Sequence, residues 1–373
     1  MPKPKHTLTD QCNSIFWINI PVCTFAAAGI FYFIKLPHTK TDLSVKLKTI
    51  DWIGMMLLSG SLTGVLYGIT AGGVLYPWSS ARIILSLVLG FIGTVAFVLY
   101  EGLVTSSPVI PLRIFATRTA ASGYFSTFVL GLTLWSLIYY LILYFLVARG
   151  HSLLHSATEI LPGIASIPIL AAIFGFMMAS TKVFQPFMLA AWVFFALGTG
   201  LLGIITPTTP IAWAYGFQLV LAVGGGILFP GRVLSVQAPQ KLEADIPVAT
   251  TMVSFFTSLG EAFGVGIGGS ILQNRWSHFV DLEVRNGVIS KQYLIPSPDA
   301  ERSAEIITHL PPAIAHLYRS IMSRSLSTLF ITLGALSGIA FVATFAQRNI
   351  SLAEKNHTRE QEKPNLENST DVL

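Results

Sequence analysis

One carboxylate, Glu261, lies inside an apolar run in which glycines recur. Thr251, Ser254, Ser258 and Glu261 follow at spacings of three, four and three residues, so on a helix they share one face. If the helix begins at residue 246, Glu261 lies about 22 Å along it, near the middle of a bilayer. An ionised carboxylate at that depth costs about 3 kcal/mol or more, so it must face a polar cavity, pair with another group or be protonated. We expect it to line a cavity and bind a proton or a cationic substrate, with Ser258 and Ser254 beside it. The alternatives are a neutral glutamate hydrogen-bonded to Ser258 or to a neighbouring helix, and drift in a damaged gene copy.

Three further polar or aromatic side chains lie inside apolar stretches. Tyr139 and Tyr140 fall mid-way along residues 119–147, where aromatic rings could stack on flat substrates or hold a cation, although packing is the commoner role. Gln218 is the one amide within its apolar stretch. It could contact a substrate, or bridge two helices with about 1 kcal/mol, and both interpretations remain open.

Glycine spacing predicts where helices approach closely. Gly260, Gly264 and Gly268 recur every four residues and form a smooth stripe for a neighbouring helix. Gly225 and Pro230, in "GGGILFPG", would loosen the helix that carries them. This flexibility could serve a rocking motion, and close helix packing is the alternative that we favour.

The residues that usually bind metals or perform catalysis are sparse. His151 and His155 lie four residues apart in a predicted outer loop, with no third ligand apparent beside them, and Glu159 is interpreted as the start of the next span. Cys12 and Cys23 would lie roughly 16 Å apart on a helix, too far for a disulfide. The sequence contains no nucleotide-binding loop, metal-ligand cluster or nucleophile triad, so we predict no metal, no cofactor and no enzymatic activity.

The composition predicts an all-α integral membrane protein that positions these residues on lipid-crossing helices. Of 373 residues, 53% are hydrophobic and 11% are charged, against about 25% charged in soluble domains. The net charge of +5 is small, and the basic residues of the chain lie at the ends of the expected spans. Both observations argue against nucleic-acid binding. Apolar stretches near bilayer length occur nine times, at 15–35, 50–70, 82–103, 119–147, 159–181, 186–206, 210–232, 246–272 and 322–346.

Lysine and arginine set the expected orientation. The loops on one side carry most of them, at Lys35, Lys40, Lys46, Lys48, Arg113, Arg118, Lys182, Arg232 and Lys241. The short loops opposite carry Arg82 and Arg149. This asymmetry predicts a cytoplasmic C-terminal tail, an outer loop at 273–321 and an outer Met1. Three Asn-X-Ser/Thr sequons in the tail should then stay unmodified: Asn349, Asn356 and Asn368.

Five stretches, in order, resemble fungal fourteen-span major facilitator transporters of the drug:proton antiporter branch. "FWINIPVCTFAAAGIFYFIKLP" is similar to their sixth span and "LKTIDWIGMMLLSGSLTGVLYGITAGGVLYPWSS" to the seventh with its following loop. "FVLYEGLVTSSPVIPLRIFATRTA" resembles the loop after the eighth, and "IYYLILYFLVARGHSLLHSATEILPG" the ninth-to-tenth connection. "VQAPQKLEADIPVATTMVSFFTSLGEAFGVGIGGSILQN" resembles the thirteenth span. The similarity covers roughly residues 15–346.

The resemblance implies a partial major facilitator fold. The family's first five spans, with their Gly/Asp/Arg-rich loop, fourth-span arginine and Gly-Pro-Gly motif, have no counterpart here, as in a truncated gene product. The family usually has a small residue where Glu261 stands, so no role carries over to it. The expected layout is a last N-terminal-bundle span, two linker helices and a complete six-helix C-terminal bundle. Its segments are an extramembrane N-terminus 1–14, the span 15–35, linker spans 36–118, the bundle 119–346 and a disordered cytoplasmic tail 347–373.

The resemblance also implies a function. The expected protein exports small hydrophobic compounds or drugs against protons by alternating access, with lipid around it and no nucleic-acid or metal partner. The plasma membrane is the expected location, with the vacuolar membrane second. The alternative is a non-transporting half-transporter remnant, or a protein that interacts with other membrane proteins, because one bundle alone has no partner to rock against.

Overall fold

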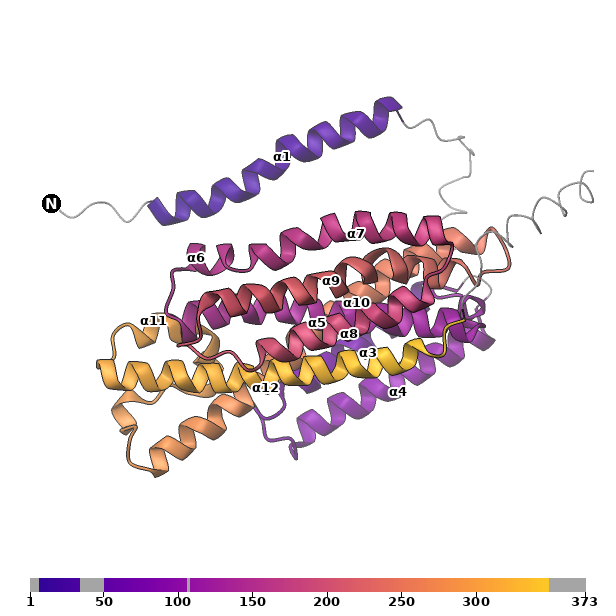
Figure 1. Cartoon of the computed structure of the whole chain (residues 1–373). Helices are drawn as coiled ribbons and strands as arrows, with labels where there is room; N and C mark the ends of the chain where they lie inside the picture. The colour runs from indigo at the N-terminus through magenta and orange to yellow at the C-terminus, as the bar shows by residue number, and fades with distance from the viewer. Residues whose placement is uncertain (1–6, 34–49, 106–107, 349–373) are drawn as a thin grey trace, which may run out of the picture. The chain divides into compact units, whose positions relative to one another are not determined.

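The computed structural model of the chain describes residues 7–33, 50–105 and 108–348 (Figure 1). Within these ranges the regular structure is helical, with one isolated β-bridge between Gly72 and Tyr76. The chain divides into two compact units, residues 1–50 and 51–373, which are described separately. The all-α class predicted from composition is confirmed.

The first unit contains one described helix, α1, which spans Thr7–Phe33. Its apolar part, Asn19–Phe33, is shorter than the span expected at 15–35, whose last two residues lie outside the described ranges. The helix begins at Thr7, within the segment expected to precede the first span. Large side chains such as Phe25 and Phe31 are exposed, as suits a helix that meets lipid.

The second unit contains eight helices that are long and apolar enough to cross a membrane, counted within the described ranges. Their bounds are α3 Trp52–Ala71, α4 Ala81–Leu103, α5 Arg118–Leu143, α7 Leu161–Thr181, α8 Gln185–Leu202, α9 Ile211–Gln237, α10 Asp245–Arg285 and α12 Pro312–Thr344. Shorter elements join them, namely η1 Leu112–Phe115, the π-helical η2 Tyr144–Ala148, α6 Leu153–Thr158, η3 Lys291–Tyr293, η4 Ser297–Arg302 and α11 Ser303–Ile307. Each of these eight helices overlaps one of the expected spans.

Local sequence explains several helix ends. Asp51 caps α3, because its carboxylate accepts a hydrogen bond from the Gly54 amide at 2.8 Å. Helices α7, α8 and α12 each have proline in the first turn, where a missing amide hydrogen costs nothing. Helix α7 ends at Thr181, and the residue after it, Lys182, has a φ of 58°, the left-handed conformation that terminates a helix.

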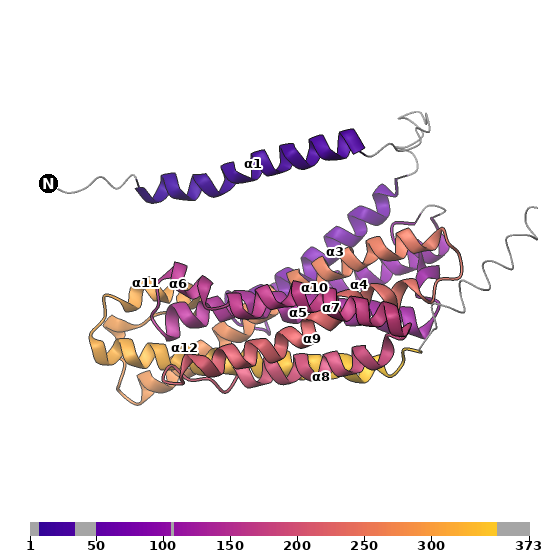
Figure 2. The ribbon, with the colours of Figure 1, turned by 45° about the horizontal axis from the view of Figure 1, so that its top comes forward.

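Six helices, α5, α7, α8, α9, α10 and α12, pack into one bundle, with α5 the most enclosed (Figure 2). Helix α5 contacts α9, α10 and α12, while α8 contacts α9 and α12. Helices α3 and α4 pair with each other, and α3 also contacts α10. The small residues Ser61, Gly64 and Gly90 allow the close approach of α3 and α4.

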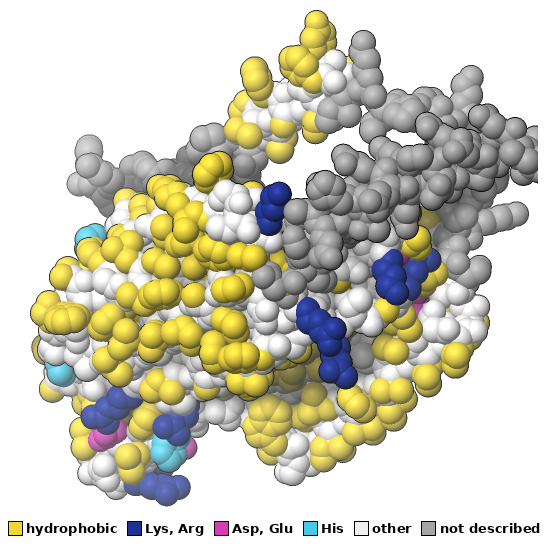
Figure 3. All heavy atoms as spheres, turned by 45° about the vertical axis from the view of Figure 1, so that its right-hand side comes forward, with side chains coloured by type: hydrophobic (Ala, Val, Ile, Leu, Met, Phe, Trp, Pro, Cys, Tyr) yellow, Lys and Arg dark blue, Asp and Glu magenta, His cyan; other side chains and the backbone are white. Residues whose placement is uncertain are grey.

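The exterior of this unit is apolar along its sides. On α4, side chains such as Leu89 and Phe91 are more than half exposed, which a soluble protein would rarely repeat along a whole helix. Figure 3 shows hydrophobic side chains over much of the described surface in that view, with Lys and Arg gathered in a few places. This distribution is the one that a lipid-embedded bundle requires.

The connection expected as an outer loop at 273–321 is largely helical. Helix α10 continues to Arg285, and α12 already begins at Pro312. The extension is held by packing, since Trp276 is fully buried and stacks on Tyr318 with ring centroids 5.5 Å apart. The Tyr318 hydroxyl also accepts a hydrogen bond from the Ile295 amide at 3.1 Å. Hydropathy alone ended the span early because charged residues return after Gln273, although the helix itself continues.

Of the expected tail at 347–373, only its first two residues lie in the described ranges. The Gln347 side chain is buried and donates to the Ser122 hydroxyl at 3.4 Å, and the Arg348 amide donates to Thr119 at 3.0 Å. The sequons at Asn349, Asn356 and Asn368 lie outside those ranges.

Candidate functional site

The polar row predicted around Glu261 lies on α10. Thr251, Ser254 and Ser258 are exposed, and Glu261 is half-buried. Thr251 donates a hydrogen bond within its own helix, to the Pro247 carbonyl at 3.0 Å. Among the described residues Glu261 forms no hydrogen bond or ion pair, so the alternative of a bond to Ser258 is not realised in this structure. In this row, therefore, Thr251 is hydrogen-bonded to its own helix, whereas the Glu261 side chain has no hydrogen-bond or ion-pair partner among the described residues.

The glycine stripe of α10 faces α5. A side-chain carbon added at Gly260 would collide with the backbone of Phe128 and Leu132, and one added at Gly264 would collide with the Leu132 carbonyl. At Gly268 it would meet the Tyr140 ring. Helices α5 and α10 thus approach with backbone against backbone at Gly260 and Gly264, while Gly268 makes room for the Tyr140 ring.

The two tyrosines of α5 have different surroundings. Tyr140 is fully buried, and its hydroxyl donates to the Val265 carbonyl of α10 at 2.9 Å. Tyr139 is 44% exposed and donates to the Glu301 carboxylate at 3.0 Å. Tyr140 therefore packs between helices, and Tyr139 remains the one with an accessible ring. Sequence reasoning missed Glu301 because it lies 162 residues further along the chain.

Gln218 bridges elements of the bundle. Its side chain is buried on α9, and its amide nitrogen donates to the Glu159 carbonyl at 3.0 Å. It also lines a cavity of about 20 Å³ with Leu137, Ile164 and Leu221, enough for about one water molecule. This hydrogen bond supports the interpretation that Gln218 bridges two elements, with Glu159 as its partner.

The glycines of α9 lie at helix contacts. A side-chain carbon at Gly224 would collide with the backbone of α8, and one at Gly226 would collide with Leu170 of α7. One at Gly225 would be 3.4 Å from Ile167. The helix runs unbroken through these residues and through Pro230. Close packing, the alternative favoured above, describes this region better than a loosened helix does.

A three-residue cluster appears where two histidines were expected without a third ligand. Glu159 Oε1 lies 3.1 Å from His151 Nδ1 and 3.3 Å from His155 Nε2. Their candidate ligand atoms all lie within 4.8 Å of one another. The spacing of four and four residues was present in the sequence, but Glu159 was interpreted only as the start of a span. That interpretation overlooked its contact with both rings.

A basic cavity of about 500 Å³ was also missed. It contains three arginines and one histidine, with hydroxyls from α12 and from the connection between α8 and α9. It is lined by Ala148, Arg149, Thr206, Pro207, Thr208, His316, Arg319, Ser320, Ser323 and Arg324. Arg149 reaches across it and donates to the Thr209 carbonyl at 2.5 Å. Sequence reasoning could not find the cavity because it forms only where Arg149, the connection between α8 and α9, and the start of α12 meet.

Two acidic residues stabilise the beginning and end of spans. Asp245 is buried at the start of α10 and pairs with Arg113 of η1 at 2.9 Å. Glu101 is buried at the end of α4 and accepts hydrogen bonds from the amides of Val109 and Ile110, at 3.0 and 3.4 Å. Both carboxylates bind neighbouring connecting segments. We therefore assign them a structural role and do not count them among the candidate site residues.

Comparison with known proteins gives consistent matches. Residues 6–178 match the model of the family "Fungal trichothecene efflux pump (TRI12)". The chain is 32% identical to MFS transporter L2 of Phoma sp. over 88% of this chain and 55% of that protein. It is 28% identical to the MFS-type transporter gkaD of Penicillium citrinum, over 95% of this chain and 62% of that one. It is 29% identical to the MFS-type efflux pump MMF1 of Pseudozyma antarctica, over 95% and 66%. The chain therefore spans between 55% and 66% of the length of these relatives.

Proposed function

Because this chain is similar to fungal major facilitator transporters over most of its length, we propose that it exports small hydrophobic compounds across a membrane by proton-coupled antiport. It is an integral membrane protein, and its relatives are transporters and not enzymes. The substrate class, the coupling ion and the membrane are part of the proposal, with the plasma membrane favoured over the vacuolar membrane.

The observation that carries the proposal is the polar row on α10. In the part of α10 up to Leu272, the helix presents the exposed Thr251, Ser254 and Ser258 and the half-buried Glu261. Its other exposed residues there are Pro247, Ala262 and Val265. Polar groups on a membrane helix are expensive against lipid, so this face suits a water-filled path. Hydroxyls along such a path can replace hydration of a passing compound.

Glu261 is the proposed proton-binding group. Since no described residue neutralises its charge, the carboxylate is free to take up a proton from one side and release it to the other. Exchange of that proton for the compound requires that the site open to the two sides in turn. The close contact of α10 with α5 along Gly260, Gly264 and Gly268 would let the two helices move as one rigid pair during such a change.

Tyr139 supplies the proposed contact for an apolar compound. Its ring is accessible, in contrast with that of Tyr140, and aromatic faces attract flat or cationic molecules. We assign Gln218 a structural role, because its amide is committed to Glu159.

Efflux of a fluorescent hydrophobic dye from yeast cells that lack their own pumps tests the proposal. Expression of the chain should speed efflux, and a protonophore should abolish the gain. Glu261→Gln should lower efflux severalfold and flatten its dependence on external pH, because the amide cannot carry a proton. Glu283→Gln is the matched control, since it removes a half-buried carboxylate from the same helix, further along. No gain on expression would refute the proposal for this chain. Equal efflux by the two variants across pH would refute the proposed role of Glu261 as the proton-binding group.

A further inference from the structure

The cluster of His151, His155 and Glu159 has the geometry of a metal site. In a tetrahedral zinc site with bonds of about 2.0–2.1 Å, neighbouring ligand atoms lie about 3.3 Å apart. Two of the three separations here are 3.1 and 3.3 Å, and the third is no more than 4.8 Å. His155 is 59% exposed, so its ring can turn to shorten the remaining separation.

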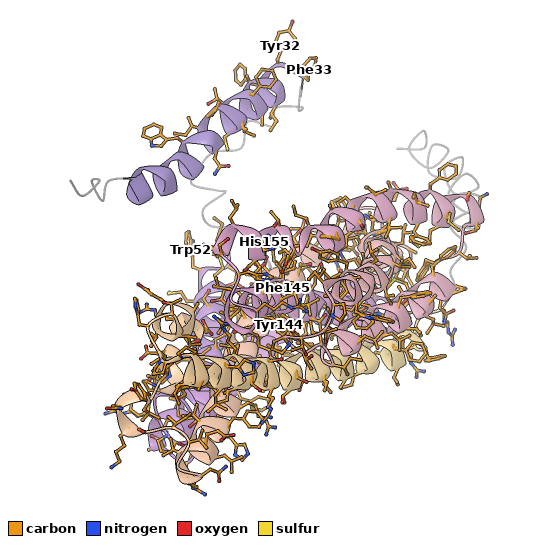
Figure 4. The ribbon with its side chains drawn as sticks, turned by 60° about the vertical axis from the view of Figure 1, so that its left-hand side comes forward. Tyr32, Phe33, Trp52, Tyr144, Phe145 and His155 are labelled. Atoms are coloured by element: carbon orange, nitrogen blue, oxygen red, sulfur yellow. The ribbon has the colours of Figure 1, made fainter. Side chains whose placement is uncertain are left out.

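The backbone brings these residues together over one short segment. Gly150 has a φ of 71°, a conformation that suits glycine, and turns the chain after η2. Ser152 then caps α6, accepting a hydrogen bond from the His155 amide at 3.3 Å. Glu159 ends this short helix, one turn beyond His155, which places its carboxylate within 3.3 Å of one nitrogen of each ring (Figure 4 labels His155 on α6).

The carboxylate of Glu159 needs a positive partner. Its side chain is 4% exposed, and its Oε2 atom has no hydrogen-bond partner among the described residues. No lysine or arginine in those ranges forms an ion pair with it. A buried charge without a partner is strongly destabilising. Neutral histidines do not cancel that charge, whereas a bound cation would.

The ligand types select the kind of cation. Two imidazole nitrogens with one carboxylate suit zinc and similar transition metals, while calcium and magnesium prefer oxygen ligands alone. Three protein ligands leave a fourth position for water. An entry path exists, because His151 also lines a cavity of about 250 Å³ with Glu305 and Arg319.

We propose that His151, His155 and Glu159 bind one divalent transition-metal ion of the zinc class. This replaces the earlier expectation that the chain has no metal partner, and it does not depend on the proposed transport. The ion would connect the end of η2 to the start of α7. Because Gln218 holds the Glu159 carbonyl, it would also strengthen the link to α9.

Calorimetric titration of the purified full chain in detergent with zinc chloride, after removal of any polyhistidine tag, tests the proposal. We expect one zinc ion per chain, with affinity falling at lower pH because protons compete for the imidazole nitrogens. His155→Ala and Glu159→Gln should each weaken binding by about 100-fold or more, since even outer-shell partners are worth about 10–100-fold.

Two controls keep the test decisive. His309→Ala removes an exposed histidine elsewhere and should leave the affinity unchanged. His155 is itself exposed, so its variant should fold even if the Glu159 variant does not, and size-exclusion chromatography checks both. Cobalt added in place of zinc should give visible absorption that His155→Ala abolishes. Absence of zinc binding, or equal binding by wild type and His155→Ala, would overturn the proposal and leave the cluster as an ion pair that depends on histidine protonation.

Discussion

Replacement of Gly260 by alanine should weaken the packing of α10 against α5. The added methyl carbon would lie 2.8 Å from the Leu132 amide nitrogen and closer still to the Phe128 carbonyl oxygen. Both are backbone atoms, which cannot turn aside as a flexible side chain would. The helices must therefore separate, and a gap of about 0.5–1 Å already loses a quarter to a half of the dispersion energy between facing atoms. Overpacking of this kind costs about 1–3 kcal/mol.

Gly338→Ala is the matched control for Gly260→Ala. Gly338 also lies inside a helix, α12, but nothing is within 4 Å of the position that its added carbon would take. Both variants gain the same helix propensity, about 1 kcal/mol in water, so the difference between them isolates the collision. The measurement is the apparent melting temperature of each purified variant in detergent, followed by size-exclusion chromatography.

Gly260→Ala should melt several degrees below Gly338→Ala. A change of 1 kcal/mol shifts the melting temperature by about 2–4 °C in domains of 150–250 residues, and by less in larger ones. Gly338→Ala should match or slightly exceed the wild-type protein. Equal melting temperatures for the two variants would refute the packing of α10 on α5 through this glycine.

Other contacts give further predictions for the same melting assay. Tyr140→Phe removes a buried hydrogen bond and should lower the free energy of unfolding by about 1 kcal/mol. Tyr139→Phe removes an exposed hydrogen bond and should lower it by less than half of that. The reverse order would contradict the burial of the two side chains. Gln218→Met should cost about 1–2 kcal/mol, because a buried carbonyl loses its donor, and an unchanged melting temperature would argue against the bridge. Arg113→Gln should destabilise more than Asp245→Asn, since it leaves a buried carboxylate unpaired, although the exposure of the arginine limits the effect to about 1 kcal/mol.

Sequence reasoning found the lipid-crossing helices because hydropathy depends on local composition. Eight of the nine expected spans correspond to long apolar helices in the described ranges, and the ninth to the shorter apolar part of α1. The glycine period of α10 also located a close contact, since a stripe every four residues lies on one helix face. The helix that packs against this stripe is α5. Its identity depends on tertiary packing, and nothing in the local sequence indicated it.

The candidate site was less accessible to sequence reasoning. The position of Glu261 on a polar row followed from helical spacing alone. The partner of Tyr139, by contrast, is Glu301, far along the chain, and such pairs follow only from the fold. The cluster around Glu159 was an available signal, since three potential ligands recur at spacings of four residues. It was overlooked because Glu159 also fits the start of a span.

The continuation of α10 to Arg285 has a practical consequence for imaging this protein. Its 41 residues extend for about 62 Å, roughly twice the thickness of the hydrocarbon layer. The end of α10, the start of α12 and the elements between them form a compact projection, a knob, in which Trp276 stacks on Tyr318. Small membrane proteins are hard to align in electron cryo-microscopy because the detergent belt hides them. This knob would project beyond the belt, and it offers a rigid epitope for an antibody fragment.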